Sequence, residues 1–115
     1  MIRKYRYGTP FDTEALTEKI ETTEGAFPYG EISQNDGFAF TYIMDEDDIV
    51  YGLGEQIRGI NKRGWQYVSW NYDNPNHHED ARSLYGAHNF IIIHGAVTFG
   101  AFFDFAGKME FDIGY

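Results

Sequence analysis

The feature that most constrains this chain is a recurrent alternation, at a period of two residues, of large apolar side chains with smaller or polar ones. A period of two places successive side chains on opposite faces of an extended strand, so that one face can enter a core while the other meets solvent. The stretches recur about every ten residues, a spacing typical of an antiparallel sandwich or barrel. The sequence therefore predicts an all-β fold, with strands at residues 38–44, 49–53, 65–70, 85–94, 98–105 and 109–114.

The first two of these predicted strands are separated only by the acidic segment 45–48, Asp-Glu-Asp-Asp. A short polar segment between two apolar runs is typical of a β-hairpin. We therefore expect residues 38–44 to pair with residues 49–53.

Residues 11–20 are the one stretch that fits a helix as well as a strand. Apolar residues at 11, 15, 16 and 20 follow Pro10 and fit a short amphipathic helix. The alternation of Leu16, Glu18, Ile20 and Thr22 fits a strand about as well. We favour the strand.

Composition bounds the classes of function. The 115 residues, without a Pro/Ser-rich linker, predict a single domain over 1–115. Nine Lys and Arg against 18 Asp and Glu give a net charge of −9, which disfavours a nucleic-acid partner. The chain has no cysteine, its longest apolar run (90–93) is too short for a membrane span, and its first residues lack a signal-peptide core. We expect a cytoplasmic protein that binds neither nucleic acid nor membrane.

Glycines punctuate the middle of the chain, above all in the stretch Gly-Leu-Gly-Glu-Gln-Ile at 52–57. A dinucleotide-binding loop needs a third glycine and a following helix, and this stretch has neither. Bulges and tight turns in a twisted sheet are the expected role of these glycines.

The polar run Trp-Asn-Tyr-Asp-Asn-Pro-Asn-His-His-Glu-Asp at 70–80 interrupts two strongly patterned strands. His77, His78, Glu79 and Asp80 are metal-ligating residue types, but adjacent residues rarely converge on one ion, so a solvated loop is favoured over a metal site. Carboxylate pairs that include Asp73 arise by chance in so acidic a chain, and no serine or cysteine nucleophile is indicated. The residues alone favour a binding protein, or part of a larger one, without metal or cofactor.

Three stretches together resemble a known family. They are Tyr-Gly-Leu-Gly-Glu at 51–55, the segment from Trp70-Asn71-Tyr72-Asp73 to Tyr-Gly-Ala-His-Asn-Phe at 85–90, and Phe-Gly-Ala-Phe-Phe-Asp at 99–104 with Met-Glu-Phe-Asp at 109–112. In order and spacing they resemble the N-terminal domain of glycoside hydrolase family 31, which includes α-glucosidases and α-xylosidases.

The resemblance implies an antiparallel β-sandwich of the galactose-mutarotase-like type, placed before a (β/α)₈ barrel that carries the catalytic aspartates. Nothing here matches the family's nucleophile motif, and the sequence stops at Tyr115 inside a strand pattern. We expect an incomplete sandwich without the barrel, inactive by itself and acting on an α-glucoside only within a full enzyme.

The resemblance also implies that the loop at about 71–83 reaches over the barrel entrance and that Asp73 binds sugar hydroxyls. Trp70, Tyr72 and His88 are the other candidate substrate-binding residues, although for Trp70 and His88, as for Glu55 and Trp65, a structural role is favoured over ligand contact. Two departures stand out. Asn89 replaces a common proline, with an effect expected only on backbone rigidity, and residues 74–82 are unusually rich in histidine and acid.

Two alternatives stay open. One is a free-standing carbohydrate-binding module in which Trp65, Trp70 and Tyr72 stack on sugar rings; strand alternation would place Trp70 and Tyr72 on one face if the strand continues. The other is a structural fragment without a ligand. Under the main interpretation as under both alternatives, the unpaired strand edges of an incomplete sandwich predict a homo-oligomer.

Overall fold

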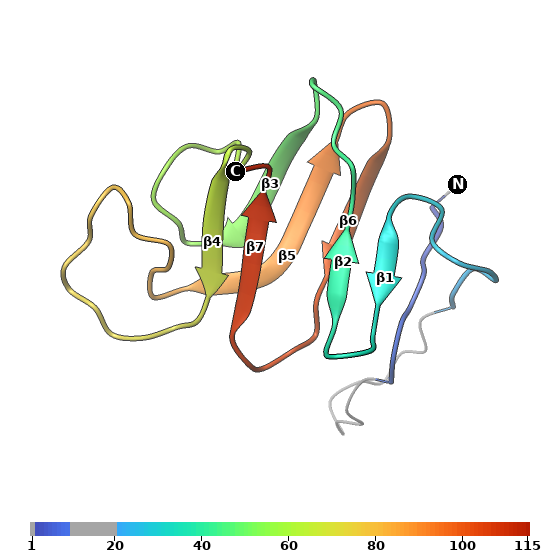
Figure 1. Ribbon diagram of the computed structural model, residues 1–115, viewed down its shortest axis with the longest axis horizontal. Coiled ribbons are helices and arrows are strands. Elements are labelled where there is room, and N and C mark those ends of the chain that lie inside the picture. The colour runs from blue at the N-terminus through green and yellow to red at the C-terminus, as the bar shows by residue number, and fades with distance from the viewer. Residues whose placement is uncertain (1, 10–20) are drawn as a thin grey trace. The chain divides into compact units, whose positions relative to one another are not determined.

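The computed structural model describes residues 2–9 and 21–115, which contain seven strands and no helix (Figure 1). Every strand pairing is antiparallel, so the predicted all-β antiparallel class is confirmed. The chain forms two compact units, residues 1–43 and 44–115. The segment 11–20, for which a strand was favoured over a helix, lies outside the described residues.

The first unit contains a short hairpin of β1 (Glu31–Ser33) and β2 (Ala39–Thr41), in which Ile32 pairs with Phe40. Phe27 is its aromatic centre: its ring centroid lies 5.6 Å from that of Tyr5, 5.6 Å from that of Tyr29 and 6.2 Å from that of Phe40. Side chains from three segments therefore pack around one ring.

The predicted hairpin between residues 38–44 and 49–53 is wrong. β2 pairs with β1, whereas β3 (Ile49–Gly54) pairs with β5 (Ala87–His94). The acidic segment makes its own turn, in which the backbone N–H of Asp45 donates to the buried carboxylate of Asp48, 2.9 Å away. The guanidinium of Arg63 donates to the carbonyls of both residues. These contacts tie the segment to the 61–64 connection.

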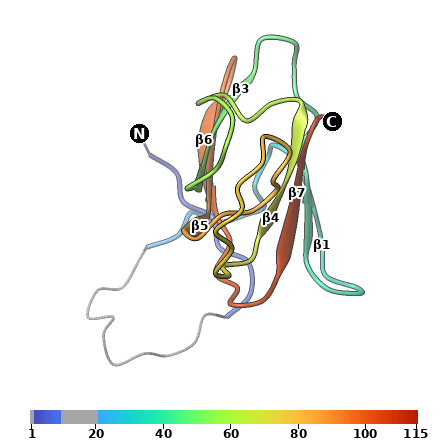
Figure 2. The ribbon, with the colours of Figure 1, turned by 90° about the vertical axis from the view of Figure 1, so that its left-hand side faces the viewer.

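The second unit is a two-layer β-sandwich. One sheet has the order β3-β5-β6, with β6 at Thr98–Phe102, and the other pairs β4 (Trp65–Ser69) with β7 (Met109–Ile113). Figure 2 shows the two sheets as separate layers. The side chains buried in its core come from both sheets and the segment before β5: Val50, Leu53, Tyr67, Leu84, Ile91, Ile93, Phe111 and Ile113.

A β-bulge at Gly52, Leu53 and Gly54 ends the regular part of β3, as the glycine pattern led us to expect. The three residues have φ of 119°, 65° and 72°. A Cβ on Gly52 would lie 2.2 Å from the carbonyl oxygen of Phe90 on the neighbouring strand, so only glycine fits there. The bulge buries Leu53 and directs Glu55 toward the segment that leads into β5.

Candidate functional site

The loop 70–86 leaves the end of β4, projects from the strands and returns to β5 (Figure 1). Its two ends are tied together by single hydrogen bonds. Ser83 Oγ donates to the carbonyl of Trp70 (2.8 Å), Val68 N–H donates to the carbonyl of Arg82 (2.7 Å), and Ala87 N–H donates to Asn71 Oδ1 (2.9 Å). The loop is therefore anchored at its base, while residues 75–80 are exposed.

The aromatic residues at the start of this loop are accessible. Trp70 is 51% exposed and Tyr72 is 47% exposed, and both lie after the end of β4 at Ser69. Because the strand does not continue to Tyr72, its alternation cannot place these two rings on one face. Trp65 is also part-exposed, but the Arg58 guanidinium lies 4.0 Å from its ring centroid in a cation–π contact.

Asp73 interacts with Tyr85, on the opposite arm of the loop. Partial burial, the hydrogen bond with Asp73 and the negative charge of Glu55 together raise the pKa of the Tyr85 hydroxyl, in that order of importance. The His77 ring packs edge-on against Tyr85, with centroids 5.4 Å apart. Tyr85 was not among the predicted site residues, although it lies within the Tyr-Gly-Ala-His stretch that carried the resemblance.

Glu55 fixes the backbone next to Tyr85. Its N–H donates to the carbonyl of Gly86 (2.8 Å), and its Oε2 accepts from the N–H of Gly86 (3.0 Å). The structural role that we favoured for Glu55 is therefore observed: its backbone and side chain join the end of β3 to the segment that precedes β5.

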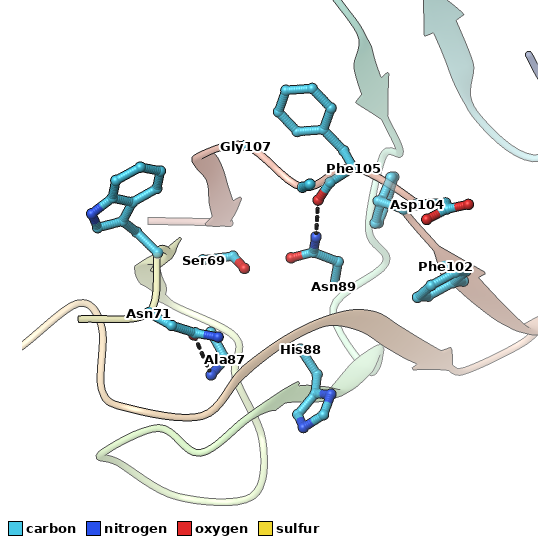
Figure 3. Close-up of a pocket in the computed structure, with 12 residues that line it drawn as sticks. Ser69, Asn71, Ala87, His88, Asn89, Phe102, Asp104, Phe105 and Gly107 are labelled. Carbon is cyan, nitrogen blue, oxygen red and sulfur yellow. Dashed lines mark hydrogen bonds between the residues drawn. The ribbon is translucent and has the colours of Figure 1, made fainter. Parts of the chain in front are cut away.

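A surface pocket of about 490 Å³ lies beside the base of the loop, lined by residues 69–71, 87–89 and 102–107 (Figure 3). Of the predicted site residues, Trp70 and His88 line this pocket, whereas Tyr72 and Asp73 are not among its lining residues. The His88 ring also packs against the β3 bulge, because a Cβ on Gly54 would lie 2.6 Å from its Cδ2 atom. The structure thus divides the predicted residues between a pocket and an exposed loop.

Asn89 has a specific structural role in this pocket, beyond the change in backbone rigidity that we expected. Its side-chain Nδ2 donates to the carbonyl of Phe105 (2.9 Å), and its backbone carbonyl accepts from the N–H of Phe103 (2.8 Å). The side chain thus holds the turn after β6 against β5. The sequence pattern gave no sign that residues 103–107 would meet the end of β4.

The histidines and acids that the structure describes do not gather into a metal centre. Within residues 2–9 and 21–115 no group of three or more His, Asp or Glu side chains is placed to hold a metal ion. His88 and His94 both lie on the exposed side of β5, and His94 Nδ1 is hydrogen-bonded to Thr98 Oγ1 at 2.8 Å. Among the same residues, no helix is long and apolar enough to cross a membrane.

Comparison with known proteins gives two matches. Residues 6–112 match the family model described as the glycosyl hydrolase 31 N-terminal galactose mutarotase-like domain. Over 86 residues the chain is 36% identical to alpha-glucosidase 2 of Bacillus thermoamyloliquefaciens, an alignment that covers 66% of this chain and 11% of the relative. The chain thus corresponds to a small part of that relative's length. The family match confirms the galactose-mutarotase-like type of sandwich that the resemblance implied.

Proposed function

We propose, because this chain belongs to the glycosyl hydrolase 31 N-terminal galactose mutarotase-like domain family, that it serves as the non-catalytic N-terminal domain of an α-glucosidase-like hydrolase. In this role the loop 71–83 shapes the entrance to the sugar site, and Asp73 holds the substrate, an α-glucoside. The observation that carries the proposal is the placement of Asp73: it is exposed on a loop anchored at its base, and its carboxylate contributes to the raised pKa of the Tyr85 hydroxyl on the opposite arm.

This placement suits sugar recognition. A carboxylate has two oxygens and can accept several charge-assisted hydrogen bonds, so Asp73 can keep its contact with Tyr85 and still accept from sugar hydroxyls. Because Glu55 fixes Gly86 by two hydrogen bonds, the backbone beside Tyr85 has a defined position. An exposed acid with a positioned neighbour loses less conformational freedom on binding than a free one.

The decisive experiment joins this domain to a catalytic one. Residues 1–115 would replace the matching segment of alpha-glucosidase 2 of B. thermoamyloliquefaciens, and Asp73→Ala would be compared with Asp80→Ala, an exposed acid of the same loop. We expect Asp73→Ala to lower kcat/KM for a disaccharide α-glucoside. The loss of transition-state stabilisation should be about 1.5–3 kcal/mol, which is typical of a hydrogen bond to a charged group. Asp80→Ala should leave kcat/KM unchanged.

Thermal unfolding of each variant controls for folding. We expect both alanine variants to unfold at the temperature of the parent chimera, since exposed loop acids contribute little to stability. The proposal is refuted if Asp73→Ala keeps wild-type kinetics on every α-glucoside tried, which would make the loop a connector, or if the variant unfolds, which would make the loop a structural element. Residues 1–115 alone should not hydrolyse a chromogenic α-glucoside, since we assign catalysis to another domain.

The sheet edges support a further part of the proposal, that the chain self-associates. Two edges are partly covered: Lys62 N–H donates to the Val50 carbonyl of β3 (2.7 Å), and Val68 N–H of β4 donates to the Arg82 carbonyl (2.7 Å). No described strand pairs with the outer edges of β6 and β7, and such edges recruit other strands. Light scattering over a dilution series should show a dimer or larger species that dissociates; a monomer at all concentrations would contradict this.

A further inference from the structure

The edges of the sandwich differ in what protects them from another chain. β3 and β4 each make a backbone hydrogen bond to a neighbouring connection, at Val50 and Val68. β6, with the sequence Thr-Phe-Gly-Ala-Phe, lies at the edge of its sheet, and no described strand pairs with its outer side. It also lacks the charges and the proline that natural edge strands use to prevent pairing. Its edge is therefore open to a further strand.

β7 is the other strand whose outer side pairs with no described strand, but its charges oppose pairing with a second copy of the chain. Glu110 and Asp112 both lie on its exposed face. Two β7 strands paired about Phe111 would place Glu110 opposite Asp112 of the second copy, and like charges directly opposite destabilise a sheet. Because the chain has a net charge of −9, contact between two copies is favoured at an uncharged strand, and β6 is uncharged.

Two hydrogen bonds show which backbone groups of β6 face the open edge. Phe103 N–H donates to the Asn89 carbonyl (2.8 Å) beyond one end of the β5–β6 ladder, and Gly95 N–H donates to the Val97 carbonyl (3.1 Å) beyond the other end. In an antiparallel ladder, residue pairs that exchange hydrogen bonds alternate with pairs that do not. The odd-numbered residues of β6 therefore bind β5, and residues 98, 100 and 102 direct their N–H and C=O groups outward.

The side chains on the exposed face of β6 also suit a close partner. Gly100, at the centre of the strand, has the Phe90 ring over it, because a Cβ on Gly100 would lie 3.1 Å from Phe90 Cζ. Thr98 is exposed on the same face, and Phe102 is 69% exposed. A second strand can thus approach the centre of β6 closely, and covering the Phe102 ring removes apolar surface from water.

We propose that two copies of this chain pair through this edge, β6 against β6, antiparallel about a two-fold axis at Gly100. Gly100 then pairs with Gly100 of the second copy, and Thr98 pairs with Phe102 of the second copy, so that the outward N–H and C=O groups of each strand bind the other. The two sheets become one continuous sheet of order β3-β5-β6-β6-β5-β3. The inference rests on the proposed self-association and names the surface that carries it.

Disulfide cross-linking tests the register, and the chain suits it because it contains no cysteine. In the proposed pairing the Cα atoms of Thr98 and of Phe102 of the second copy are about 5.5 Å apart, within reach of a disulfide. We expect an equimolar mixture of Thr98→Cys and Phe102→Cys chains to form a covalent dimer under mild oxidation. Either variant alone should cross-link poorly, because its two cysteines would lie about 14 Å apart along the strands. A mixture of Glu110→Cys and Asp112→Cys chains, the matched control on β7, should stay uncross-linked.

The dissociation constant of the dimer, from light scattering over a dilution series, tests the backbone contact. Thr98→Pro removes an N–H that faces the open edge, and proline is tolerated at the first residue of a strand. The Kd should rise about thirtyfold, because each dimer loses two hydrogen bonds worth about fivefold each. Thr98→Ala, the matched control, loses the side chain but keeps the N–H, and should raise the Kd less than about threefold.

The outcomes separate this pairing from self-association as such. A monomer at all concentrations would overturn both. A dimer that neither cross-links between positions 98 and 102 nor responds to Thr98→Pro would overturn the β6 pairing alone, as would cross-linking of the β7 cysteines. If circular dichroism shows that Thr98→Pro does not fold, cross-linking decides, since the exposed Thr98 and Phe102 can be replaced without opening the core.

Discussion

The sheet β3-β5-β6 and the loop 70–86 are held by different means. In the sheet, β5 is hydrogen-bonded on both sides: Ile91 and Ile93 each pair with one residue of β3 and one of β6. Their side chains are buried in the core. In the loop, Ser83 Oγ donates one hydrogen bond and Asn71 Oδ1 accepts one at the base, and among residues 70–86 only Ser83 and Leu84 are buried. Many ladder hydrogen bonds thus set the geometry of the sheet, whereas one or two hydrogen bonds hold each anchored point of the loop. A substitution in the sheet should therefore lower the stability of the whole unit, whereas one in the loop should mainly loosen the loop.

The largest expected effect breaks the sheet at its bulge. Gly52→Ala forces a residue with a Cβ into a φ of 119° and places that Cβ 2.2 Å from the Phe90 carbonyl oxygen. The backbone conformation alone should cost about 1–3 kcal/mol of the free energy of unfolding, and the collision with β5 should add to this. Urea denaturation followed by circular dichroism measures the sum.

Gly64→Ala separates the two contributions. Gly64 also has positive φ, 85°, but no heavy atom would lie within 4 Å of its added Cβ. Its destabilisation should therefore report the backbone strain without the collision. Equal losses for Gly52→Ala and Gly64→Ala would show that β5 moves aside at no cost, and that the ladder is looser than we describe.

The same contrast explains what sequence reasoning could find. Period-two alternation identified β3 to β7 to within a few residues, because the core requires one apolar face from each strand. The pairing of residues 38–44 with 49–53 failed because partner choice is non-local: β3 pairs with a strand about 40 residues later. The alternation of apolar and polar residues cannot predict that Arg63 donates hydrogen bonds to the carbonyls of Asp45 and Asp48.

The predicted site residues stay predictions, and the structure shows only where they lie. Trp70, Asp73 and His88 were selected because they lie in or next to a loop between two patterned strands and match the family motif. Neither criterion could decide which of them share a pocket. Asn89 and the turn 103–107 escaped because their meeting depends on side-chain hydrogen bonds between segments distant in sequence. Tyr85 was visible as part of a motif, yet its link to Asp73 exists only once the loop closes.

A smaller effect is expected when one loop anchor is removed. Asn71→Ala deprives the Ala87 N–H of its acceptor, and should cost about 1 kcal/mol of the free energy of unfolding. Hydrogen exchange at residues 71–87 should quicken, while exchange within β5 beyond Ile91 should stay as in the parent. Asn76→Ala, on the exposed part of the same loop, is the matched control and should change neither quantity. Faster exchange throughout β5 would mean that loop and sheet unfold as one unit.

The smallest effect concerns the proton of Tyr85, and it tests the loop contact most directly. Since the folded pKa lies above the ordinary value of 10.0, the protonated hydroxyl is favoured in the folded chain. Its contribution to stability is full below pH 10.0 and is lost as the pH rises through the raised pKa. Titration of isotope-labelled tyrosine ring carbons should show Asp73→Asn lowering the Tyr85 pKa more than Glu55→Gln does, because the hydrogen bond to Asp73 outweighs the charge of Glu55. Neither substitution should return the Tyr85 pKa to 10.0, because partial burial, the largest cause, remains.

A Tyr85 pKa that does not respond to Asp73→Asn would mean that the two arms of the loop do not meet in solution. Asp73 would then lack the positioned neighbour on which its assignment to the sugar rests.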